Sequence, residues 1–505
     1  MGAKEDITSK VGIAFDARKG RAVDTECCAL VIGLTRKALP KGAATELDKA
    51  MGGALTKIVS GVDAGPDLCK THMIFTKHYP IKPERVILVG IGGDEMVPAL
   101  EKVRLGFATA ANMCEKLGLK KIVGLLPAGA SAEVARAMAE GFGLGAYRWD
   151  RFRSDKRKGA ESFTVLAENA KDLRTAAKAI DVSRVLCETV WLARDLCNTP
   201  GNELHPKAMA EHARTLAKAN GLDLRILGPK EIAEKGMCGL LTVSKGSAEE
   251  PRFIELEYNG ARSKNARPIV LVGKAITFDS GGLSLKPVEK MDEMKFDMTG
   301  GAVVLGVVAA AKRLGLPLHL VALVPCCENM PGGRAYRPGD VITFSNKKSV
   351  EVISTDAEGR LILADALLRA AELGPRYVVD IATLTMGIKT VLAGMAAGVW
   401  GTDDGLVAAL VRAGETTQER LWKFPMWPVF DDLIEGDTAD LKNSGGREGS
   451  SITATRFLYH FTSYPWAHID IAGTAWVDKD RGYLQKGGTA FGVRLFIQWL
   501  SGLKA

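Results

Sequence analysis

The sequence predicts an α/β protein of two domains, each built on a mixed or largely parallel sheet flanked by helices, with a long linker helix joining them. Three observations support this fold class. Strand-like apolar runs alternate with helix-like segments along most of the chain, a rhythm typical of βα units. The 505 residues suffice for two to four domains. A helical pattern over 171–200 meets the breaker sequence NTPGNELHP, so we expect an N-terminal domain over 1–170 and a second domain over 201–505.

Two βα pairs stand out in the N-terminal domain. The apolar run VILVGIGG at 86–93 predicts a strand, and the stretch 98–117 after it predicts a helix. KIVGLLPAG at 121–129 predicts another strand, which an Ala- and Glu-rich helical stretch at 131–141 follows. A helix between two strands returns the chain to the same end of the sheet, so these pairs favour parallel strands.

The overall composition is that of a globular protein. Apolar residues make up 47% and charged residues 25% of the chain, which excludes disorder over most of its length. The nine cysteines are an odd number without a C-x-x-C pair, a pattern typical of reduced thiols inside a cell. No apolar run approaches the 18 residues or so of a membrane span. We therefore expect a cytoplasmic protein that does not enter a membrane.

The net charge of +8 belongs to one end of the chain. Residues 1–180 contain 29 Lys and Arg against 21 Asp and Glu, and the stretch RFRSDKRKG at 151–159 is densely basic. One hypothesis is a nucleic-acid-binding or regulatory role for this region, which would show as salt-sensitive binding. The interpretation we favour is a solvated loop beside the linker helix.

Familiar nucleotide and catalytic motifs are missing. The glycines of GIGGDE at 90–95 lack the third glycine of a dinucleotide-binding loop, and the two acids after them would repel a phosphate. P-loop, G-x-S-x-G and H-E-x-x-H motifs do not occur. The seven histidines are isolated from one another, so any bound metal needs oxygen ligands.

Four acids in the second domain are candidates for those ligands. Asp279 ends an apolar strand pattern before Gly-Gly, and Asp297 precedes another Gly-Gly. Asp356 and Glu358 alternate in a turn between a strand and a helix. Each acid taken singly is explained by capping a turn or helix. Four acids at the carboxyl ends of strands would repel one another, and divalent cations would remove that repulsion.

Three basic residues share these stretches. Lys274 ends the strand before Asp279, Lys286 follows the Gly-Gly loop, and Arg360 lies two residues after Glu358. A lysine beside dications is either neutral, with a lone pair for a metal, or positioned to meet an anionic transition state. The residues alone leave both roles open.

A family resemblance spans residues 195–505. The strings VGKAITFDSGGLSLKP, MKFDMTGGA, AYRPGDVI, STDAEGRLILADAL, DIATLT and WAHIDIAGTAW resemble those of the leucyl aminopeptidase family of dinuclear metallo-exopeptidases, in order and spacing. The N-terminal domain is similar only in its α/β rhythm. The resemblance implies an enzyme that removes the N-terminal residue of peptides, assembled as a homohexamer.

The resemblance also implies a role for each charged side chain of the cluster. The metal ligands it implies are Lys274, Asp279, Asp297, Asp356 and Glu358, with Asp279 and Glu358 shared between two metals. The catalytic residues it implies are Lys286, which stabilises the oxyanion, and Arg360, which holds a bicarbonate that moves the proton. All seven residues are present, which predicts an active enzyme. The metals remain open among Zn²⁺, Mn²⁺, Co²⁺ and Mg²⁺.

The substrate pocket departs from the family pattern. Met386 stands after the TLT triplet where the family has glycine, and Ser354 stands where the family usually has Asn. The change at Met386 leaves open whether leucine or another apolar residue is preferred. The expected substrate-binding residues are Met294, Thr383, Leu384, Met386 and Ala475.

Overall fold

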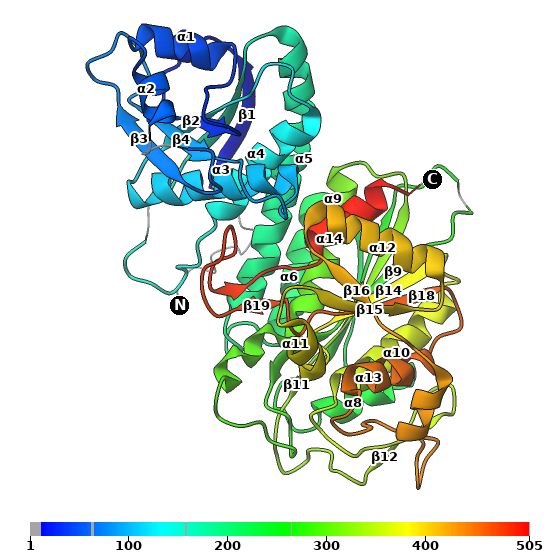
Figure 1. Cartoon of the computed structure of the whole chain (residues 1–505). Coiled ribbons are helices and arrows are strands. Elements are labelled where there is room, and N and C mark those ends of the chain that lie inside the picture. Colours follow the sequence, from blue (N-terminus) through cyan, green and yellow to red (C-terminus); the bar gives the residue numbers. More distant parts are fainter. Residues whose placement is uncertain (1–11, 62–64, 157–158, 264, 504–505) are drawn as a thin grey trace. The chain divides into compact units, whose positions relative to one another are not determined.

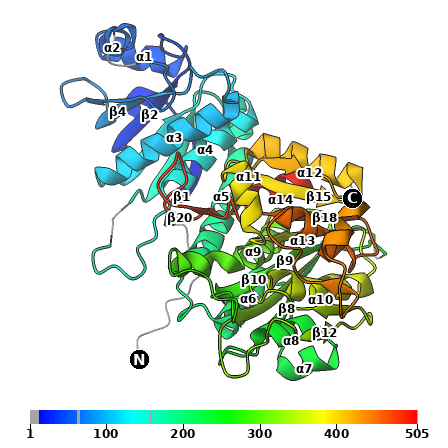
Figure 2. The same cartoon turned by 60° about the horizontal axis from the view of Figure 1, so that its bottom comes forward.

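The computed structural model describes residues 12–61, 65–156, 159–263 and 265–503. It divides into two compact units, and each is a mixed α/β structure, which confirms the predicted fold class (Figures 1 and 2). The chain passes from the N-terminal to the C-terminal unit after Trp191. The segment Asp478–Lys486, from late in the sequence, belongs to the N-terminal unit.

The N-terminal unit has a six-stranded sheet within the described residues, in the order β1-β6-β5-β2-β4-β3. Only the edge strand β3 runs antiparallel to its neighbour. The strands are β1 (Ala14–Lys19), β2 (Ala29–Leu34), β3 (Thr71–Phe75), β4 (Arg85–Gly90), β5 (Lys121–Leu125) and β6 (Ser162–Ala167). The helices are η1 (Ala22–Asp24), α1 (Ala43–Ala50), α2 (Ala54–Ser60), α3 (Ala99–Lys116) and α4 (Ala132–Gly145). The helix α5 (Ala170–Asn198) begins in this unit and belongs to the C-terminal unit from Leu192.

Helices cover both faces of this sheet. On one face α3 and α4 pack against each other and against the strands, around a core that includes Phe107, Phe142 and Phe163. On the other face α1 and α2 close a second core around Leu47 and Leu55. The inner strands β2, β4 and β5 are apolar and buried on both faces for this reason, as expected for a parallel sheet.

The Gly-rich turn after β4 packs against backbone. A Cβ atom added at Gly90 would lie 1.8 Å from the carbonyl oxygen of Asp67, and one at Gly92 would lie 2.5 Å from that of Thr35. The strand predicted over 86–93 is β4, which ends earlier than predicted, at Gly90. These glycines are explained by close backbone approach.

The C-terminal unit is built on a nine-stranded mixed sheet of described residues. Its order is β16-β15-β18-β14-β9-β11-β8-β7, and β10 pairs with β11 beside this path. The central strands β18, β14, β9, β11 and β10 are parallel. The nine strands are β7 (Asp223–Leu227), β8 (Arg252–Asn259), β9 (Ile269–Gly273), β10 (Ala275–Asp279), β11 (His319–Asn329), β14 (Tyr377–Ala382), β15 (Ala397–Gly401), β16 (Leu421–Lys423) and β18 (Trp466–Asp470).

Helices flank this sheet as well. In Figures 1 and 2, α6, α9, α12 and α14 lie on one face and α8, α10 and α13 on the other, in agreement with their packing contacts. The helices are α6 (Pro206–Asn220), α7 (Pro229–Glu234), α8 (Cys238–Ser244), η2 (Met291–Met298), α9 (Thr299–Arg313), α10 (Gly359–Glu372), α11 (Met386–Leu392), α12 (Asp404–Thr417), η3 (Pro428–Leu433), α13 (Ser450–Tyr459) and α14 (Val493–Ser501). Short strands pair outside the main sheet, namely β12 (Val341–Thr343), β13 (Ser349–Glu351), β17 (Leu441–Lys442), β19 (Trp476–Val477) and β20 (Gly487–Gly488).

The helix α9, which follows Asp297 in the sequence, is buried over most of its length. Among the described residues, Met291–Arg313 is the one helical segment long and apolar enough to cross a membrane, and 89% of its apolar window is buried inside the protein. That burial is typical of a core helix. All nine cysteines are free, as predicted.

Candidate active site

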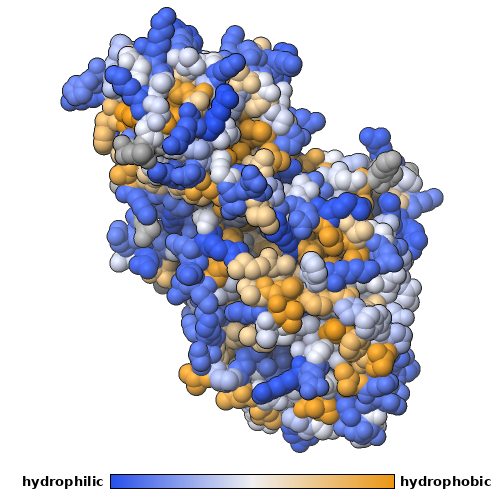
Figure 3. Space-filling view, viewed as in Figure 1, coloured by the Kyte–Doolittle hydropathy of each residue, from blue (hydrophilic) through white to orange (hydrophobic). Residues whose placement is uncertain are grey.

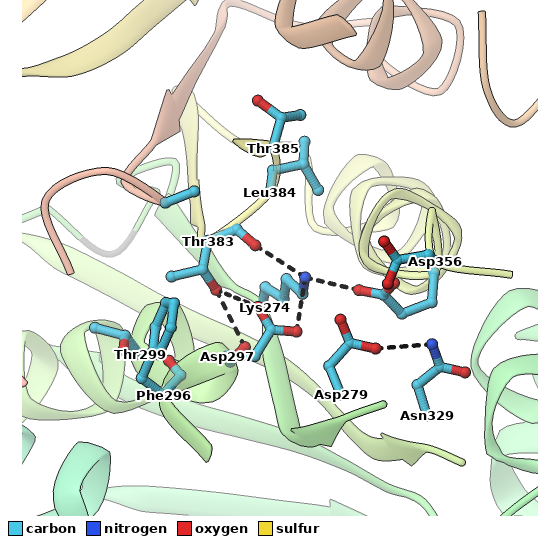
Figure 4. Close-up of polar contacts among 12 residues, drawn as sticks. Lys274, Asp279, Phe296, Asp297, Thr299, Asn329, Asp356, Thr383, Leu384 and Thr385 are labelled. Atoms are coloured by element: carbon cyan, nitrogen blue, oxygen red, sulfur yellow. Dashed lines mark hydrogen bonds and ion pairs between the residues drawn. The ribbon is translucent and has the colours of Figure 1, made fainter. Parts of the chain in front are cut away.

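Lys274 lies between β9 and β10, where the sheet continues from one strand to the next. Its backbone N–H donates to Ile381 O at 3.2 Å, and its carbonyl accepts from Gly301 N at 2.8 Å. The side chain is buried, and its Nζ contacts Asp297 Oδ2 at 2.9 Å and Glu358 Oε1 at 2.8 Å (Figure 4). Lys274 therefore forms ion pairs with two carboxylates that lie far apart in the sequence.

Asp297 reaches this point from the 3₁₀ helix η2. Its Oδ1 accepts from Thr383 Oγ1 at 2.7 Å, and the carbonyl of Thr383 accepts from Lys274 Nζ at 3.0 Å (Figure 4). Thr383 follows β14 directly, so the carboxyl end of that strand contributes to the site. The three residues form one buried polar network.

Asp279 is the last residue of β10 and is buried. Its Oδ1 accepts from Asn329 Nδ2 at 2.9 Å and from Gly281 N at 2.9 Å. Gly281 has φ +86°, and a Cβ atom there would lie 2.8 Å from Asp356 Oδ1. The glycine thus permits the turn that places Asp279 beside Asp356.

Asp356 and Glu358 lie in the turn before α10, and Glu358 is the residue immediately before the helix. One oxygen each of Asp279, Asp356 and Glu358 lies within 4.8 Å of the others. Gly359 opens the helix, and a Cβ atom there would lie 2.7 Å from Lys274 Nζ. The acids predicted from the sequence therefore converge, and neither histidine nor cysteine belongs to this group of described residues.

Lys286 reaches the same group from the loop after β10. Its Nζ forms ion pairs with Asp279 Oδ2 at 2.7 Å and with Asp356 Oδ1. About a fifth of the side chain is exposed, so the ammonium group is accessible from the cavity.

Arg360 is buried in the first turn of α10. Its Nη1 donates to Asn443 O at 2.7 Å, whereas its buried Nε has no hydrogen-bond partner among the described residues. Burial lowers the pKa of Arg360 to about 10, although nearby carboxylates oppose this effect. A buried guanidinium with an unused N–H beside a cavity is suited to a small anion.

Burial also governs the ionisation of the carboxyl groups. It raises the pKa of Asp279, and it raises the pKa of Asp356 to about 6, with a further increase in each case from a neighbouring carboxylate. Burial raises the pKa of Asp297 well above its usual value, and Lys274 opposes this change. These acids are held close together at an electrostatic cost that bound cations would relieve.

Burial has the opposite effect on the pKa values of the two lysines, but the neighbouring carboxylates outweigh it. Burial alone would lower their pKa values, but the carboxylates around them raise the pKa of both Lys274 and Lys286 above the ordinary value. Burial alone would raise the pKa of Glu358, but the two lysines lower it. The cluster is therefore strongly coupled, with charge of both signs in a small volume.

The donor set fits two divalent cations. It combines four carboxylates with one amine, ligands that suit borderline and hard divalent metals. Glu358 Oε2 is buried and has no hydrogen-bond partner among the described residues, so it is available to a cation. The residues that would hold the metals are those predicted from the sequence, Lys274, Asp279, Asp297, Asp356 and Glu358.

A cavity of about 660 Å³ contains this cluster and extends away from it. The four expected substrate-binding residues Met294, Thr383, Leu384 and Met386 line the cavity. Ala475 is fully buried and is not among the described residues that line it. Ser354, the other departure from the family pattern, lies in the lining as well.

The sequence analysis missed three residues that support the site. Asn329 ends β11 and bonds Asp279, while Asn443 bonds the backbone N–H of Ile353 through its side chain and accepts from Arg360. Asp470 ends β18 and accepts from the backbone N–H groups of Leu384, Thr385 and Ala472. A polar residue at the end of an apolar strand pattern is the signal that could have revealed Asn329 and Asp470.

The fold and the site together define an α/β metallohydrolase whose dinuclear site lies at the carboxyl edge of a mixed sheet. The catalytic-domain model of the cytosol aminopeptidase family matches residues 191–497, and the N-terminal-domain model of the same family matches 31–156. The chain belongs to the cytosol aminopeptidase family. It is a metal-dependent aminopeptidase, a hydrolase of peptides.

Individual relatives cover nearly the whole chain. A probable cytosol aminopeptidase of Geotalea uraniireducens is 41% identical over 484 residues, which are 95% of this chain and 97% of the relative. One from Roseiflexus castenholzii is 45% identical over 426 residues, 82% of this chain and 86% of the relative. The match therefore includes the N-terminal unit as well as the catalytic one.

Solved structures are similar over both units. A mutant of tomato leucine aminopeptidase superposes with a TM-score of 0.86 at 30% identity, covering 97% of this chain and 96% of that one. The bottromycin maturation enzyme BotP in complex with Mn gives a TM-score of 0.80 at 32% identity, covering 94% of this chain and 99% of that one. The fold of the family is thus present throughout the matched region.

Proposed function

We propose that this aminopeptidase removes leucine, or another apolar N-terminal residue, from peptides with a free N-terminus. The observation that carries the proposal is the convergence of seven charged side chains on one cavity at the carboxyl edge of the sheet. The apolar lining beside them, with Met294, Leu384 and Met386, supports an apolar side chain at the substrate's first position.

The metal ligands proposed are Lys274, Asp279, Asp297, Asp356 and Glu358. When bound, two divalent cations polarise the scissile carbonyl and acidify a water molecule. Lys274 contributes a neutral amine in this state, because an ammonium group has no lone pair for a metal. Zn²⁺ and Mn²⁺ are the metals we expect, and Co²⁺ and Mg²⁺ are alternatives. The Mn complex of BotP supports manganese as one candidate.

Lys286 and Arg360 are the proposed catalytic residues. Lys286 keeps its charge and reaches the cavity, so its ammonium group stabilises the negative charge that develops on the carbonyl oxygen. Arg360 presents its unused Nε–H to a small anion, which we propose to be bicarbonate. Bicarbonate held there would supply a base that takes a proton from the attacking water and passes it to the leaving amine.

The substrate's α-amine is placed at the acidic end of the cavity. A free amine is attracted by the buried carboxylates, whereas a blocked N-terminus loses that interaction. Asp470 accepts from Leu384 N and Thr385 Oγ1 in the loop after β14, which fixes the position of the neighbouring wall. Cleavage after one residue follows from anchoring the amine and the first carbonyl together.

A cytoplasmic location and a homohexameric assembly complete the proposal. The relatives are named cytosol aminopeptidases, and the free cysteines agree with a reducing compartment. Nucleic acid is not a favoured partner.

The first prediction tests the metal ligands. Asp279→Ala and Glu358→Ala each remove a ligand, so we expect hydrolysis of leucyl amide to fall by about 100-fold or more, beyond the usual cost of losing a supporting residue. Metal content per chain, measured by elemental analysis, should fall as well. Asp223→Ala changes an exposed carboxylate on β7 and should alter neither quantity. Wild-type turnover in the ligand variants would refute the proposed site.

A further inference from the structure

Arg447 is a charged residue of the cavity to which the reaction described above assigns no role. The described charged residues in the cavity lining are the seven of the metal cluster and Arg447. These seven define the metal end of the cavity, where Lys274 and Lys286 pair with the four acids and Arg360 donates to Asn443 O. The rest of the lining is neutral, with Phe424 and Val391 among its members, so Arg447 is the only other charge of the cavity in the part of the chain that the structure describes.

The guanidinium of Arg447 is available to a ligand. The residue is exposed, and it has neither a hydrogen-bond nor an ion-pair partner among the described residues. The neighbouring Glu448 is exposed too, but it is not part of the cavity lining. An arginine facing a cavity without an acidic partner is suited to a carboxylate, which it can bind through two parallel hydrogen bonds.

The loop that carries Arg447 is fixed to the catalytic residues. Asn443 accepts from Arg360 Nη1 at 2.7 Å, and its side chain accepts from Ile353 N at 2.7 Å and donates to Ser354 O at 2.7 Å. Arg447 lies four residues further along, a distance of at most about 14 Å for an extended chain. The loop thus begins at the catalytic arginine and brings a second arginine to the outer part of the same cavity.

Chain length relates this position to a peptide. A substrate with its amine at the metal end leads its backbone outward through the cavity, and an extended tripeptide spans about 10 Å. The carboxylate at its C-terminus therefore arrives in the outer, otherwise neutral part of the cavity. This requires the placement of substrate given under the proposed function, on which the inference rests.

We propose that Arg447 binds a carboxylate of the substrate beyond the scissile bond and so favours short peptides that carry one. The carboxylate has two sources, the free C-terminus of a di- or tripeptide and an acidic side chain at the second or third position. We favour the C-terminus, because each short peptide has one whatever its sequence. The enzyme then discriminates by peptide length as well as by the first residue.

The test compares substrates that differ only in charge. We would measure kcat/KM of the metal-loaded full chain for Leu-Gly-Gly and for its C-terminal amide, and likewise for Leu-Gly-Asp-amide and Leu-Gly-Asn-amide. In the wild type the free acid should be preferred. In Arg447→Gln the acid-to-amide ratio should fall by about fivefold, chiefly through KM, as expected for loss of a partly exposed ion pair. Arg447→Lys should restore part of the preference.

Two controls separate the possible failures. Arg412→Gln alters an exposed arginine of α12 outside the cavity and should leave each ratio as in the wild type. High ionic strength should lower the wild-type preference but not that of Arg447→Gln. A change confined to the Asp and Asn amides would overturn the C-terminus in favour of an acidic side chain. Ratios unaffected by Arg447→Gln in both pairs would overturn the proposal, whereas failure of the wild type on leucyl amide would overturn the proposed function itself.

Discussion

Lys274 connects more of the candidate site than any other residue of the cluster. Its backbone joins β9 and β10 to the first turn of α9, and its side chain contacts Asp297, Glu358 and Thr383. Removing the amine would leave two buried carboxylates without their shared partner, a change that costs far more than loss of an exposed charge. The same side chain thus supports the fold without metal and is a proposed ligand with it.

Met386 allows a residue-level prediction about specificity. It begins α11, lines the cavity and is 66% exposed. Met386→Gly enlarges the space for the first side chain, so we expect kcat/KM to shift from leucyl toward phenylalanyl amide by about fivefold, the effect of roughly one or two methylene groups in an apolar pocket. Turnover of leucyl, methionyl and phenylalanyl amides measures this. Met395→Gly is the matched control, and identical profiles for all three proteins would remove Met386 from the pocket.

At the scale of elements, the strong periodicities of the sequence were sufficient for most of the fold. The βα pairs near 86–117 and 121–141 and the linker helix all correspond to elements of the structure. The apolar strand pattern that ends at Asp279 is divided at Lys274 into β9 and β10, and Lys274 N bonds a strand more than 100 residues away. The 3₁₀ helix η2, which carries Asp297 into the site, was not predicted. Local patterns contain no information on such distant partners.

The residues of the candidate site likewise divide into those that local motifs predicted and those that depend on distant partners. The acids and lysines were predicted because their motifs are local in the sequence. Asn329, Asn443 and Asp470 were not, because each acts through a partner that only folding brings near. Ala475 is buried away from the cavity lining for the same reason, since its place depends on the packing of the segment after β18.

Asp365 on α10 predicts a pH dependence of stability. Its carboxyl group is buried, Oδ2 accepts from Leu240 N at 2.7 Å, and Oδ1 has no hydrogen-bond partner among the described residues. Burial raises the pKa of Asp365 well above its usual value, although the N–H groups of α8 oppose this. The unfolded chain therefore loses this proton at lower pH than the folded chain, and stability falls as pH rises from the ordinary pKa toward the raised one.

The variant Asp365→Asn keeps an acceptor for Leu240 but cannot ionise. We expect its stability relative to wild type to improve as the pH increases from about 4, the ordinary pKa of an aspartate, toward neutrality. Thermal unfolding at a series of pH values measures the difference. Asp223→Asn, on the exposed start of β7, should follow the wild type. Parallel curves for Asp365→Asn and wild type would contradict this account.

At the scale of the whole molecule, the exposed apolar side chains of the C-terminal unit predict association. Figure 3 shows hydrophobic side chains gathered over the region of α11, where Met395 is exposed beside the cavity residues Met386 and Val391. Trp427 and Val429 are exposed as well. Large exposed apolar surface is typical of interfaces. We expect light scattering after size exclusion to give six times the 54.0 kDa of the chain, and a monomer that persists at high concentration would contradict the hexamer.

The contacts of the basic stretch 151–159 in the N-terminal unit bear on its role. Residues 157 and 158 lie outside the described part of the chain. Lys156 donates to the carbonyl groups of Asp150 and Arg151, and the Arg151 guanidinium lies over the ring of Phe152. Two of its described cations, Arg151 and Lys156, therefore have partners in or beside the stretch, which favours a solvated loop over a nucleic-acid interface.

The segment Asp478–Lys486 has a consequence for dissecting the protein genetically. It belongs to the N-terminal unit, where Gln485 donates to Gly145 O at 2.9 Å, although the chain around it belongs to the catalytic unit. A single stop codon or start codon near Trp191 therefore yields an N-terminal fragment that lacks part of its own unit, or a catalytic fragment with an orphaned loop. Separate expression of either unit therefore requires a second junction. In the catalytic fragment this junction joins Val477 directly to Gly487, its partner in the β19–β20 pair.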